Sequence, residues 1–378
     1  MKVMTILGTR PEIIRLSLII PLLDRYAEHV LVHTGQNYDD RLDAMFFRDL
    51  GVRDPDVRLD VRGSGFGEQA GQILARIEPV LLEHGPDRVL VLGDTNSGLA
   101  AIVARRLGIP VYHMEAGNRC FDDRVPEEVN RRVIDHASTV LMPYTERSRE
   151  NLLAEGIAPD RVHVIGNPIK QVLDAHADAI ARSRALEDLG VTSGQYVLVT
   201  MHRAENVDRE DTLRGLVDAL RRVHRAYRHP VICSFHPRTR SKVEQFRVDI
   251  AAEGLRFVPP LGLFDFVRLE QHAFCVLSDS GTVQEEACIF RVPNVTLREV
   301  TERPETIDCG SNVLAGTEAD AILAAVRLVT GESRAWDPPQ EYLAPNVAET
   351  VCRIVTGYRV PDAAALGWQE SKTCRQEL

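Results

Sequence analysis

The sequence predicts an α/β protein made of two Rossmann-like, doubly wound domains that face a cleft. Through the first half of the chain, short apolar runs alternate with amphipathic stretches, and the same alternation begins again after a polar, Ala-rich segment at 168–190. Alternating strands and helices imply a parallel sheet that is covered by helices on both faces. A length of 378 residues leaves room for a packed core in each half.

The first domain is predicted to span residues 1–168. Its strands are expected at the short apolar runs, which are 3–7, 30–34, 88–92, 110–114, 140–142 and 162–165. The stretches between them carry apolar residues at helical spacing, and this predicts helices at 12–23, 39–50, 67–84, 97–107, 127–136 and 145–155.

The second domain is predicted to span residues 169–347. It opens with helical sequence at 168–190 and continues with strands expected at 196–200, 231–235, 257–259, 274–277 and 294–297. Helices are expected at 209–227, 239–252, 264–271, 282–289 and 319–330. Residues 348–378 are expected to pack back on the first domain, with a helix to about 368 interrupted at Pro361 and a loose polar tail.

Composition excludes several classes of protein. A net charge of −10 argues against general binding to nucleic acid or to an anionic membrane. The chain starts with a strand-like run in place of a signal peptide, and its apolar runs fall short of the roughly 20 residues that span a bilayer. Seven cysteines without a CxxC pair are typical of small buried side chains in a reducing cytoplasm, so a cytoplasmic location is expected.

The stretch SDSGTVQEEA at 278–287 joins an apolar run to the start of a helix. A strand–helix junction of this kind points free N–H groups and the positive helix end at one spot, which suits a phosphate. Glu285 and Glu286 follow one turn later, where a carboxylate can accept hydrogen bonds from a ribose. The segment therefore indicates a nucleoside diphosphate, although an ordinary N-capped helix with solvated glutamates fits it as well.

Charged side chains follow the expected strands of the first domain. Arg10 lies in the turn after Gly8, and Asp94 and Glu115 come directly after apolar runs. Asp94 is either the N-cap of the next helix or a catalytic carboxylate. An acid at the end of a buried strand, such as Glu115, needs a partner or a function. Glu127 and Arg131 share a helix face and either pair with each other or serve the site.

The second domain places His and Arg together after two of its strands. His202 with Arg203 follows one strand, and His236 with Arg238 follows another. Such clusters complement a diphosphate without a metal ion, and no HExxH or Cys-rich pattern predicts a metal site. Acids opposite a sugar nucleotide indicate proton transfer or glycosyl chemistry. Ligands of doubly wound sheets bind outside the carboxyl ends of the strands, so the expected site is the cleft between the domains.

Seven motifs, taken together, resemble the non-hydrolysing UDP-N-acetylglucosamine 2-epimerases. They are GTRPE at 8–12, GDTNS at 93–97, HMEAGNR at 113–119, PEEVNRR at 126–132, MHRAENVD at 201–208, SDSGTVQEEA at 278–287 and TERPE at 301–305. The resemblance runs to about residue 360 and implies a two-domain fold of the glycosyltransferase-B type. It also implies a homodimer and closure of the domains over a UDP-sugar.

The resemblance implies inversion at C2 of the sugar without any cofactor. The C2 proton is removed and UDP leaves C1, which gives a 2-acetamido-glycal that is then protonated on its other face before UDP adds back. Asp94, Glu115 and Glu127 match the family's catalytic acids, and His202 matches a position implicated in catalysis. Phe266 matches a contact of the uracil ring and Glu286 the ribose-binding acid. The other implied substrate-binding positions are Arg10, Arg15, Arg131, Arg203, His236, Arg238, Ser280, Gly281, Thr282 and Arg298.

Departures from the common GlcNAc epimerases narrow the expected substrate. This chain has Arg15 where those enzymes have Lys, and Ser280-Gly281-Thr282 where they have the sequence SGG. Its loop between Glu115 and Glu127 is shorter, and residues 36–40 stand in place of their QHREM sequence. The chain is similar instead to the branch that makes UDP-N-acetyl-L-fucosamine from UDP-2-acetamido-2,6-dideoxy-L-talose, which shares HTGQNYD at 33–39, HMEAGNRCFD at 113–122, RVPEE at 124–128 and HPRTR at 236–240. Epimerisation of UDP-GlcNAc and UDP-ManNAc, hydrolysis to UDP and free sugar, glycosyl transfer and nucleotide-sugar sensing are the alternatives.

Overall fold

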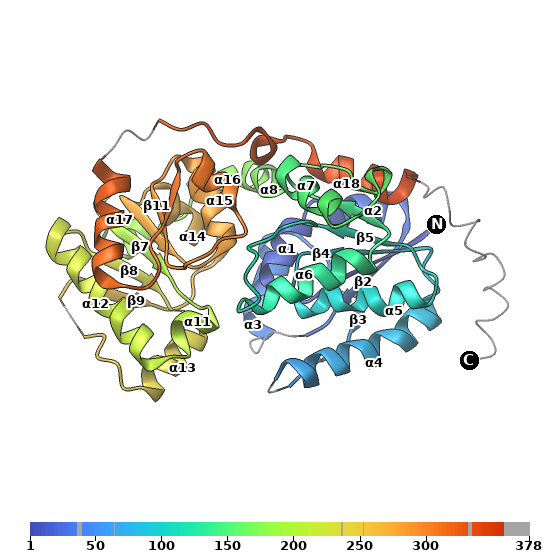
Figure 1. Ribbon diagram of the computed structural model, residues 1–378, viewed down its shortest axis with the longest axis horizontal. Helices are drawn as coiled ribbons and strands as arrows, with labels where there is room; N and C mark the ends of the chain where they lie inside the picture. Colours follow the sequence, from blue (N-terminus) through green and yellow to red (C-terminus); the bar gives the residue numbers. More distant parts are fainter. Residues whose placement is uncertain (36–39, 64, 236, 252, 332–334, 359–378) are drawn as a thin grey trace. The chain divides into compact units, whose positions relative to one another are not determined.

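The computed structural model describes residues 1–35, 40–63, 65–235, 237–251, 253–331 and 335–358 (Figure 1). It divides into two compact units. The first unit is Met1–Val172 together with the chain from Ala344 onward, and the second unit is Leu173–Leu343. Each unit is built around one parallel sheet of six strands.

The sheet of the first unit has the strand order β3-β2-β1-β4-β5-β6, and all its pairings are parallel. Its strands are β1 Lys2–Leu7, β2 Glu28–His33, β3 Val57–Arg58, β4 Arg88–Leu92, β5 Val111–Met114 and β6 Val140–Met142. The chain first builds the sheet outward from β1 to β3 and then returns to add β4 on the other side of β1. In this arrangement ligands bind at the point where the order reverses, here beyond the ends of β1 and β4.

Helices connect these strands and cover the sheet. They are α1 Arg10–Leu16, α2 Ile19–Tyr26, α3 Asp40–Asp49, α4 Phe66–His84, α5 Ala100–Arg106, α6 Pro126–Ala137 and α7 Glu146–Ala154, with short 3₁₀ turns at Asn96–Leu99 and Pro159–Arg161. The next helix, α8 Ile169–Ala175, crosses from the first unit into the second. One core cluster joins alternate residues of β1 and β4, such as Ile6 and Val91, to Ile73 and Ile77 of α4, all of them fully buried. The alternation along each strand therefore fixes which face receives the helices.

The single helix predicted at 12–23 is wrong, because the structure has two, α1 and α2. Pro21 lies in the first turn of α2 and has no N–H for the carbonyl of Ser17. The Ser17 hydroxyl donates to the carbonyl of Ile14 at 2.7 Å, which completes the end of α1. A proline is tolerated at the start of a helix and breaks a continuous one.

Other expectations for the first unit need smaller corrections. The strand predicted at 162–165 is wrong, since among the described residues this segment makes only an isolated bridge between Leu141 and Val162. The two-residue strand β3 was not predicted, because two residues are too few for an alternating pattern.

The second unit repeats the topology of the first. Its strand order is β12-β11-β10-β7-β8-β9. The chain first adds β8 and β9 on one side of β7 and then returns to add β10 on the other side, so the order reverses between β7 and β10. The strands are β7 Val197–Thr200, β8 Val231–Ser234, β9 Leu255–Val258, β10 Cys275–Ser278, β11 Asn294–Thr296 and β12 Asn312–Leu314, and all pairings are parallel. The predicted fold class, two Rossmann-like domains of the glycosyltransferase-B type, is confirmed.

The helices of the second unit pack on both faces of its sheet. They are α9 Ala177–Ala181, α10 Ala185–Asp188, α11 Ala204–Val207, α12 Glu210–Tyr227, α13 Pro237–Gln245, α14 Leu263–Gln271, α15 Gly281–Phe290, α16 Pro304–Asp308 and α17 Ala319–Gly331, with a 3₁₀ turn at Gln340–Leu343. Val197 and Val199 belong to a cluster with residues of α12 and α17, whereas Leu198 belongs to a cluster with α14 and α15. The helix predicted at 239–252 ends early, at Gln245, and Arg247 has a φ of +48° that cannot continue a helix.

The last described helix, α18 at Val347–Gly357, belongs to the first unit and lies beside α2 (Figure 1). Gln171 accepts a hydrogen bond from the N–H of Ala348 at 2.9 Å, and Tyr112 donates from its hydroxyl to the carbonyl of Tyr358 at 3.0 Å. Chain that follows the second unit therefore completes the first. The remainder of the helix predicted to 368 lies outside the described residues. Among the described residues, no helix combines the length and the apolar character needed to cross a membrane.

Candidate active site

The loops after β1 and β4 meet at the reversal point of the first sheet. Glu12, only 1% exposed, joins them, because one carboxylate oxygen accepts from the N–H of Gly8 at 3.0 Å and from the Thr9 hydroxyl at 2.7 Å. Its other oxygen accepts from the hydroxyl of Thr95 at 3.1 Å. Burial raises the pKa of Glu12 to about 7 despite these donors.

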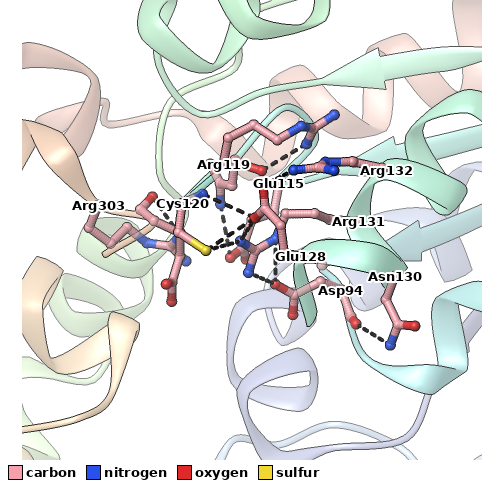
Figure 2. A network of polar contacts seen from close by, with 12 residues as sticks. Asp94, Glu115, Arg119, Cys120, Glu128, Asn130, Arg131, Arg132 and Arg303 are labelled. Carbon is pink, nitrogen blue, oxygen red and sulfur yellow. Dashed lines mark hydrogen bonds and ion pairs between the residues drawn. The ribbon is translucent and has the colours of Figure 1, made fainter. Parts of the chain in front are cut away.

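Asp94 follows β4 and forms an ion pair with Arg131 of α6 (Figure 2). The Nη2 and Nε atoms of Arg131 donate to Oδ2 of Asp94 at 2.5 and 3.1 Å, and Asn130 donates to the backbone carbonyl of Asp94 at 3.0 Å. The Asp94 side chain keeps 25% of its surface exposed, whereas Arg131 keeps 2%. Thr95, and not Asp94, is the N-cap of the next helical turn, so the capping interpretation of Asp94 is wrong.

The same arginine also binds Glu128, which is fully buried (Figure 2). Nη1 of Arg131 donates to Glu128 at 2.6 Å, and the backbone N–H groups of Cys120 and Phe121 donate to Glu128 at 3.0 and 3.1 Å. Burial by itself raises the pKa of Glu128, but the Cys120 N–H and Arg131 outweigh it and leave the pKa below the usual range. Glu128 thus holds the loop after β5 against α6.

Glu115 follows β5 and is 9% exposed. Its carboxylate forms a buried ion pair with Arg15 of α1, and Asn118 donates to its other oxygen at 3.3 Å. Its φ of +62° is left-handed, a strained conformation for a side chain of this size and one that concentrates at functional sites. Gly117, two residues on, has a φ of +79°, and a Cβ there would meet the carbonyl of Ser148 at 2.1 Å, so only glycine fits.

The structure places the other predicted residues of the first unit nearby in the fold. Glu127 lies partly exposed in the first turn of α6, where the positive helix end favours a carboxylate. Arg10 is the first residue of α1, and its guanidinium lies 6.0 Å from the centre of the Phe46 ring. Both therefore belong to elements that begin at the carboxyl edge of the sheet.

The reversal point of the second sheet carries His202 and Asp279. The N–H groups of His202 and Arg203 each donate to Oδ2 of Asp279 at 2.9 Å, and Nδ1 of His202 lies 3.1 Å from Oδ1. Arg203 also donates to the Asp279 carbonyl at 3.1 Å and pairs with Glu302 at 3.2 Å. The loops after β7 and β10 are thereby joined.

The helix α15 begins at the end of β10, with Ser280 as its N-cap and Gly281 and Thr282 as its first residues. Among the residues that the structure describes, no side chain caps this end with a hydrogen bond. A Cβ on Gly281 would lie 2.8 Å from Oε1 of Glu302, so the backbone passes this carboxylate closely. The geometry matches the strand–turn–helix that the sequence predicts for a phosphate site.

Glu285 and Glu286 are buried in α15, at 0% and 3% exposure, so the interpretation as solvated glutamates is wrong. Glu285 forms an ion pair with Arg303. Burial, together with the neighbouring Glu286, raises the pKa of Glu270 well above its usual value.

The remaining predicted residues are dispersed over the second unit. Phe266 of α14 is partly buried against the core cluster that includes Val283. Arg298 is 2% exposed and pairs with Glu302 at 2.8 Å, but its Nε and Nη2 have no hydrogen-bond partner in the described part of the chain. Arg238 pairs with Asp208 on the surface, and His236 lies outside the described residues.

A family model for UDP-N-acetylglucosamine 2-epimerases matches residues 23–356. The chain belongs to this family. It is 40% identical over 364 residues to the UDP-N-acetylglucosamine 2-epimerase of Methanocaldococcus jannaschii, a match that covers 94% of this chain and 99% of that protein. The crystal structure of the M. jannaschii UDP-GlcNAc 2-epimerase in complex with UDP-GlcNAc and UDP is similar with a TM-score of 0.90 at 38% identity, covering 94% and 99% of the two chains.

Members of this epimerase family are named for more than one sugar. The UDP-2,3-diacetamido-2,3-dideoxy-D-glucuronate 2-epimerase of Pseudomonas aeruginosa is 37% identical over 337 residues, covering 88% of this chain and 93% of that protein. The family predicted from the seven motifs is confirmed, and this protein is an isomerase. Within its described residues, no group of three or more His, Cys, Asp or Glu side chains forms a candidate metal site.

Several residues of this epimerase site were not predicted from the sequence. Glu12, Glu128 and Asp279 are buried carboxylates that hold the loops of the site, and all three lie inside the quoted motifs. Their spacing alone did not separate them from their exposed neighbours. The signal for Asp279 was its position directly after an apolar run, where a buried acid needs donors.

Proposed function

We propose that this protein is a UDP-N-acetylaminosugar 2-epimerase that converts UDP-2-acetamido-2,6-dideoxy-L-talose into UDP-N-acetyl-L-fucosamine for a capsule or O-antigen polysaccharide. The observation that carries the type of reaction is the pairing of Asp94 with Arg131 and of Glu115 with Arg15 at one sheet edge, in a chain of this family. In each pair an arginine lies beside a carboxylate at the place where the reaction needs a proton acceptor.

The reaction starts with removal of the C2 proton and cleavage of the bond between C1 and the diphosphate oxygen. UDP leaves with the bonding electron pair, and the sugar becomes a 2-acetamido-glycal. A proton then reaches C2 from the opposite face, and UDP adds back to C1. Because C2–H is only weakly acidic, the charge that develops on UDP has to be met by donors that are already in place.

The acids Asp94, Glu115 and Glu127 are proposed to serve the two faces of the sugar. Inversion requires one group to accept a proton and a second group to donate one from the other side. Asp94 and Glu115 follow neighbouring strands, and Glu127 begins the helix that carries Arg131. A helix N-terminus and two arginines can therefore balance the charge of three acids near one sheet edge.

The second unit is proposed to bind UDP. Arg203, His202 and the N–H groups at Ser280, Gly281 and Thr282 are assigned to the diphosphate, together with Arg10, His236 and Arg238. Glu286 is assigned to the ribose and Phe266 to the uracil. The buried, unsatisfied Nε and Nη2 of Arg298 support its assignment as a ligand-binding residue, since such donors are costly without an acceptor.

The sugar is assigned from the loop after Glu115. Its Cys120 and Phe121 N–H groups are held by Glu128, and Phe121 is 73% exposed with a φ of +55°. A short loop that is held by Glu128 is proposed to suit a sugar without a 6-hydroxyl. The alternative substrates are UDP-GlcNAc and UDP-ManNAc, which the name of the M. jannaschii relative favours, and a hydrolysing enzyme would release UDP and free sugar.

The proposal is tested by incubating the protein in D₂O with UDP-2-acetamido-2,6-dideoxy-L-talose and, separately, with UDP-GlcNAc, and following C2 by NMR. Deuterium at C2 with a mixture of L-talo and L-fuco sugars supports the proposal. Exchange with UDP-GlcNAc alone assigns the alternative substrate, and free sugar assigns hydrolysis. The triple variant Asp94→Asn, Glu115→Gln, Glu127→Gln is the control, and exchange by this variant would refute the assignment of the acids.

The domain roles and the assembly belong to the same proposal. The catalytic acids are assigned to residues 1–168 and UDP binding to 169–347, with the chain after 348 completing the first domain. A cytoplasmic homodimer is proposed through the first domain, where α4 exposes Phe66 and Leu82 at 58% and 49%. Sedimentation equilibrium checks the dimer. None of the six described cysteines is in a disulfide, which fits a reducing compartment.

A further inference from the structure

Asp279 is a fully buried carboxylate directly after β10. Its Oδ2 accepts three hydrogen bonds, from the N–H groups of His202 and Arg203 at 2.9 Å and from Nδ2 of Asn206 at 3.0 Å. All three donors come from the short segment that follows β7. A carboxylate is buried only where donors compensate for the lost water, so this segment is shaped around one oxygen of Asp279.

The second oxygen, Oδ1, faces the imidazole of His202. Nδ1 of His202 lies 3.1 Å from Oδ1, which is close enough for an ion pair. The two groups are not aligned well enough to count as a hydrogen bond. The ring is 36% exposed, in contrast to the buried carboxylate. Because Oδ1 can only accept a proton, Nδ1 is the ring nitrogen that carries hydrogen, and Nε2 lies on the side of the ring away from Asp279.

We infer that Asp279 is a positioning residue that keeps the proton of His202 on Nδ1, so that Nε2 is the atom that meets the substrate. The inference rests on the proposed function for the role of His202 and adds the group that controls it. A carboxylate in this position fixes the tautomer and orientation of the ring and stabilises the imidazolium. In the imidazolium that Asp279 stabilises, Nε2 also carries a proton, which passes to the diphosphate oxygen as the C1–O bond breaks and leaves a neutral ring with hydrogen on Nδ1. Nε2 takes the proton back when UDP adds to C1 again.

The charges around His202 are compatible with this role. Burial on its own raises the pKa of Asp279, but His202 and the N–H groups of Arg203 and His202 outweigh it, so the pKa lies well below the usual range. Arg203 pairs with Glu302, which is also paired with Arg298. Glu205, in the turn after His202, lies 3.7 Å from Arg298. Since each of these nearby charges has an opposite partner, Asp279 is the group assigned to His202.

Asp279→Asn tests the inference. The amide oxygen can still accept from the three N–H donors, but the NH₂ group then faces Nδ1, which must become an acceptor. The proton of neutral His202 then moves to Nε2. The substitution of Asn for Asp in a comparable pair lowers kcat by about 10⁴, and a fall of at least about 10² with little change of KM is expected here.

The tautomer is measured directly, without substrate, by ¹⁵N–¹H NMR of histidine-labelled protein, with His202→Gln identifying the signals. The wild type is expected to show hydrogen on Nδ1 and the variant hydrogen on Nε2. Asn206→Ala, which removes one donor from Oδ2 and leaves Oδ1 in place, is the matched control and keeps the wild-type tautomer and pH profile of kcat. Should Asp279→Asn fail to fold, the wild-type tautomer still decides, because hydrogen on Nε2 there overturns the inference.

The NMR result separates this inference from the proposed function. If the tautomer changes in Asp279→Asn but the wild type does not exchange C2, the positioning role is upheld. The epimerase reaction is then rejected for the sugars tried. If the wild type exchanges C2 and Asp279→Asn keeps the wild-type tautomer, the reaction is upheld and the inference is overturned.

Discussion

Arg15 of α1 neutralises Glu115, a residue 100 positions further along the chain, in an ion pair where the two side chains are 2% and 9% exposed. The guanidinium also lies 5.4 Å from the centre of the Tyr144 ring. The pair therefore joins three segments of the first unit, and the flat guanidinium adds the contact with the Tyr144 ring.

Arg15→Met leaves the Glu115 carboxylate buried without its counter-ion and is expected to lower the free energy of unfolding by about 3–5 kcal/mol. Chemical denaturation of the intact protein measures this change. Arg15→Lys keeps the charge but loses the fork and the contact with Tyr144, so a smaller loss is expected. In the double variant Arg15→Met, Glu115→Gln, most of the stability should return, and a double variant as unstable as Arg15→Met would show that the charge is not the cause.

Glu12→Gln is expected to change stability in a pH-dependent way, because burial raises the pKa of Glu12 from 4.5 to about 7. Between these values the folded protein retains a proton that the unfolded chain has lost. The contribution of Glu12 to the free energy of unfolding therefore falls as the pH rises from 4.5 to about 7, and it is smallest at high pH, where the buried carboxylate is charged. The variant cannot titrate, so the difference in unfolding free energy should move in its favour by up to about 3 kcal/mol from pH 5 to pH 8.

The measurement for Glu12 is the difference between variant and wild type in denaturant unfolding at pH 5, 6.5 and 8. Exchange of the exposed Glu78 for Gln is the control, and its difference should stay constant over this range. A constant difference for Glu12→Gln as well would contradict the expectation.

Cys309 is expected to be the most reactive described cysteine. The hydrogen bond from the Cys288 thiol, at a sulfur–sulfur distance of 3.6 Å, lowers the pKa of Cys309 to about 6. Burial raises the pKa of Cys120, which is also partly exposed, to about 11. At pH 7.5 iodoacetamide should alkylate Cys309 at least about tenfold faster than Cys120, because the thiolate is the nucleophile.

Peptide mass spectrometry follows the two cysteines over time. Cys374 lies outside the described residues and is replaced by Ser in all proteins tested. Cys288→Ala removes the donor and should slow the alkylation of Cys309. Equal rates at Cys309 and Cys120 would be evidence against the hydrogen-bonded thiolate.

Gly281→Ala is expected to weaken UDP binding. The new Cβ would lie 2.8 Å from Glu302, whose carboxylate is held by Arg298 and Arg203, so the first turn of α15 must shift. A strain of about 1–3 kcal/mol corresponds to a loss of about 5- to 150-fold in affinity, which calorimetry measures. Gly215→Ala, in the interior of α12 with its nearest contact at 3.9 Å, should leave affinity unchanged and raise stability by about 0.5–1 kcal/mol. Equal affinities of the two variants would refute the close approach at Gly281.

Periodicity predicted most of the fold because each sheet is buried on both faces. The runs that became β1, β4, β7 and β10 are continuous apolar segments, and the helices between them carry one apolar face. The prediction failed where one or two residues decide the structure, because a periodic pattern needs a longer stretch of sequence. Pro21 divides a helix that its apolar residues would continue, and Val57–Arg58 forms a strand too short to carry a pattern.

The site was predicted in part for a similar reason. Asp94, Glu115 and His202 follow apolar runs, so their place at a sheet edge could be inferred from the sequence alone. Their partners Arg15, Arg131 and Asp279 come from other segments of the chain, and only the strand order of each sheet brings them together. Which neighbour of a pair is buried, as with Glu128 rather than Glu127, depends on packing that spacing does not encode.

Helix α18 packs on α2, although the whole second unit lies between them in the chain. During synthesis, the first sheet leaves the ribosome early, but the helix that covers α2 follows only when the second unit has been made. Until synthesis has passed Val347, the nascent chain therefore exposes the part of the α2 surface that α18 later covers.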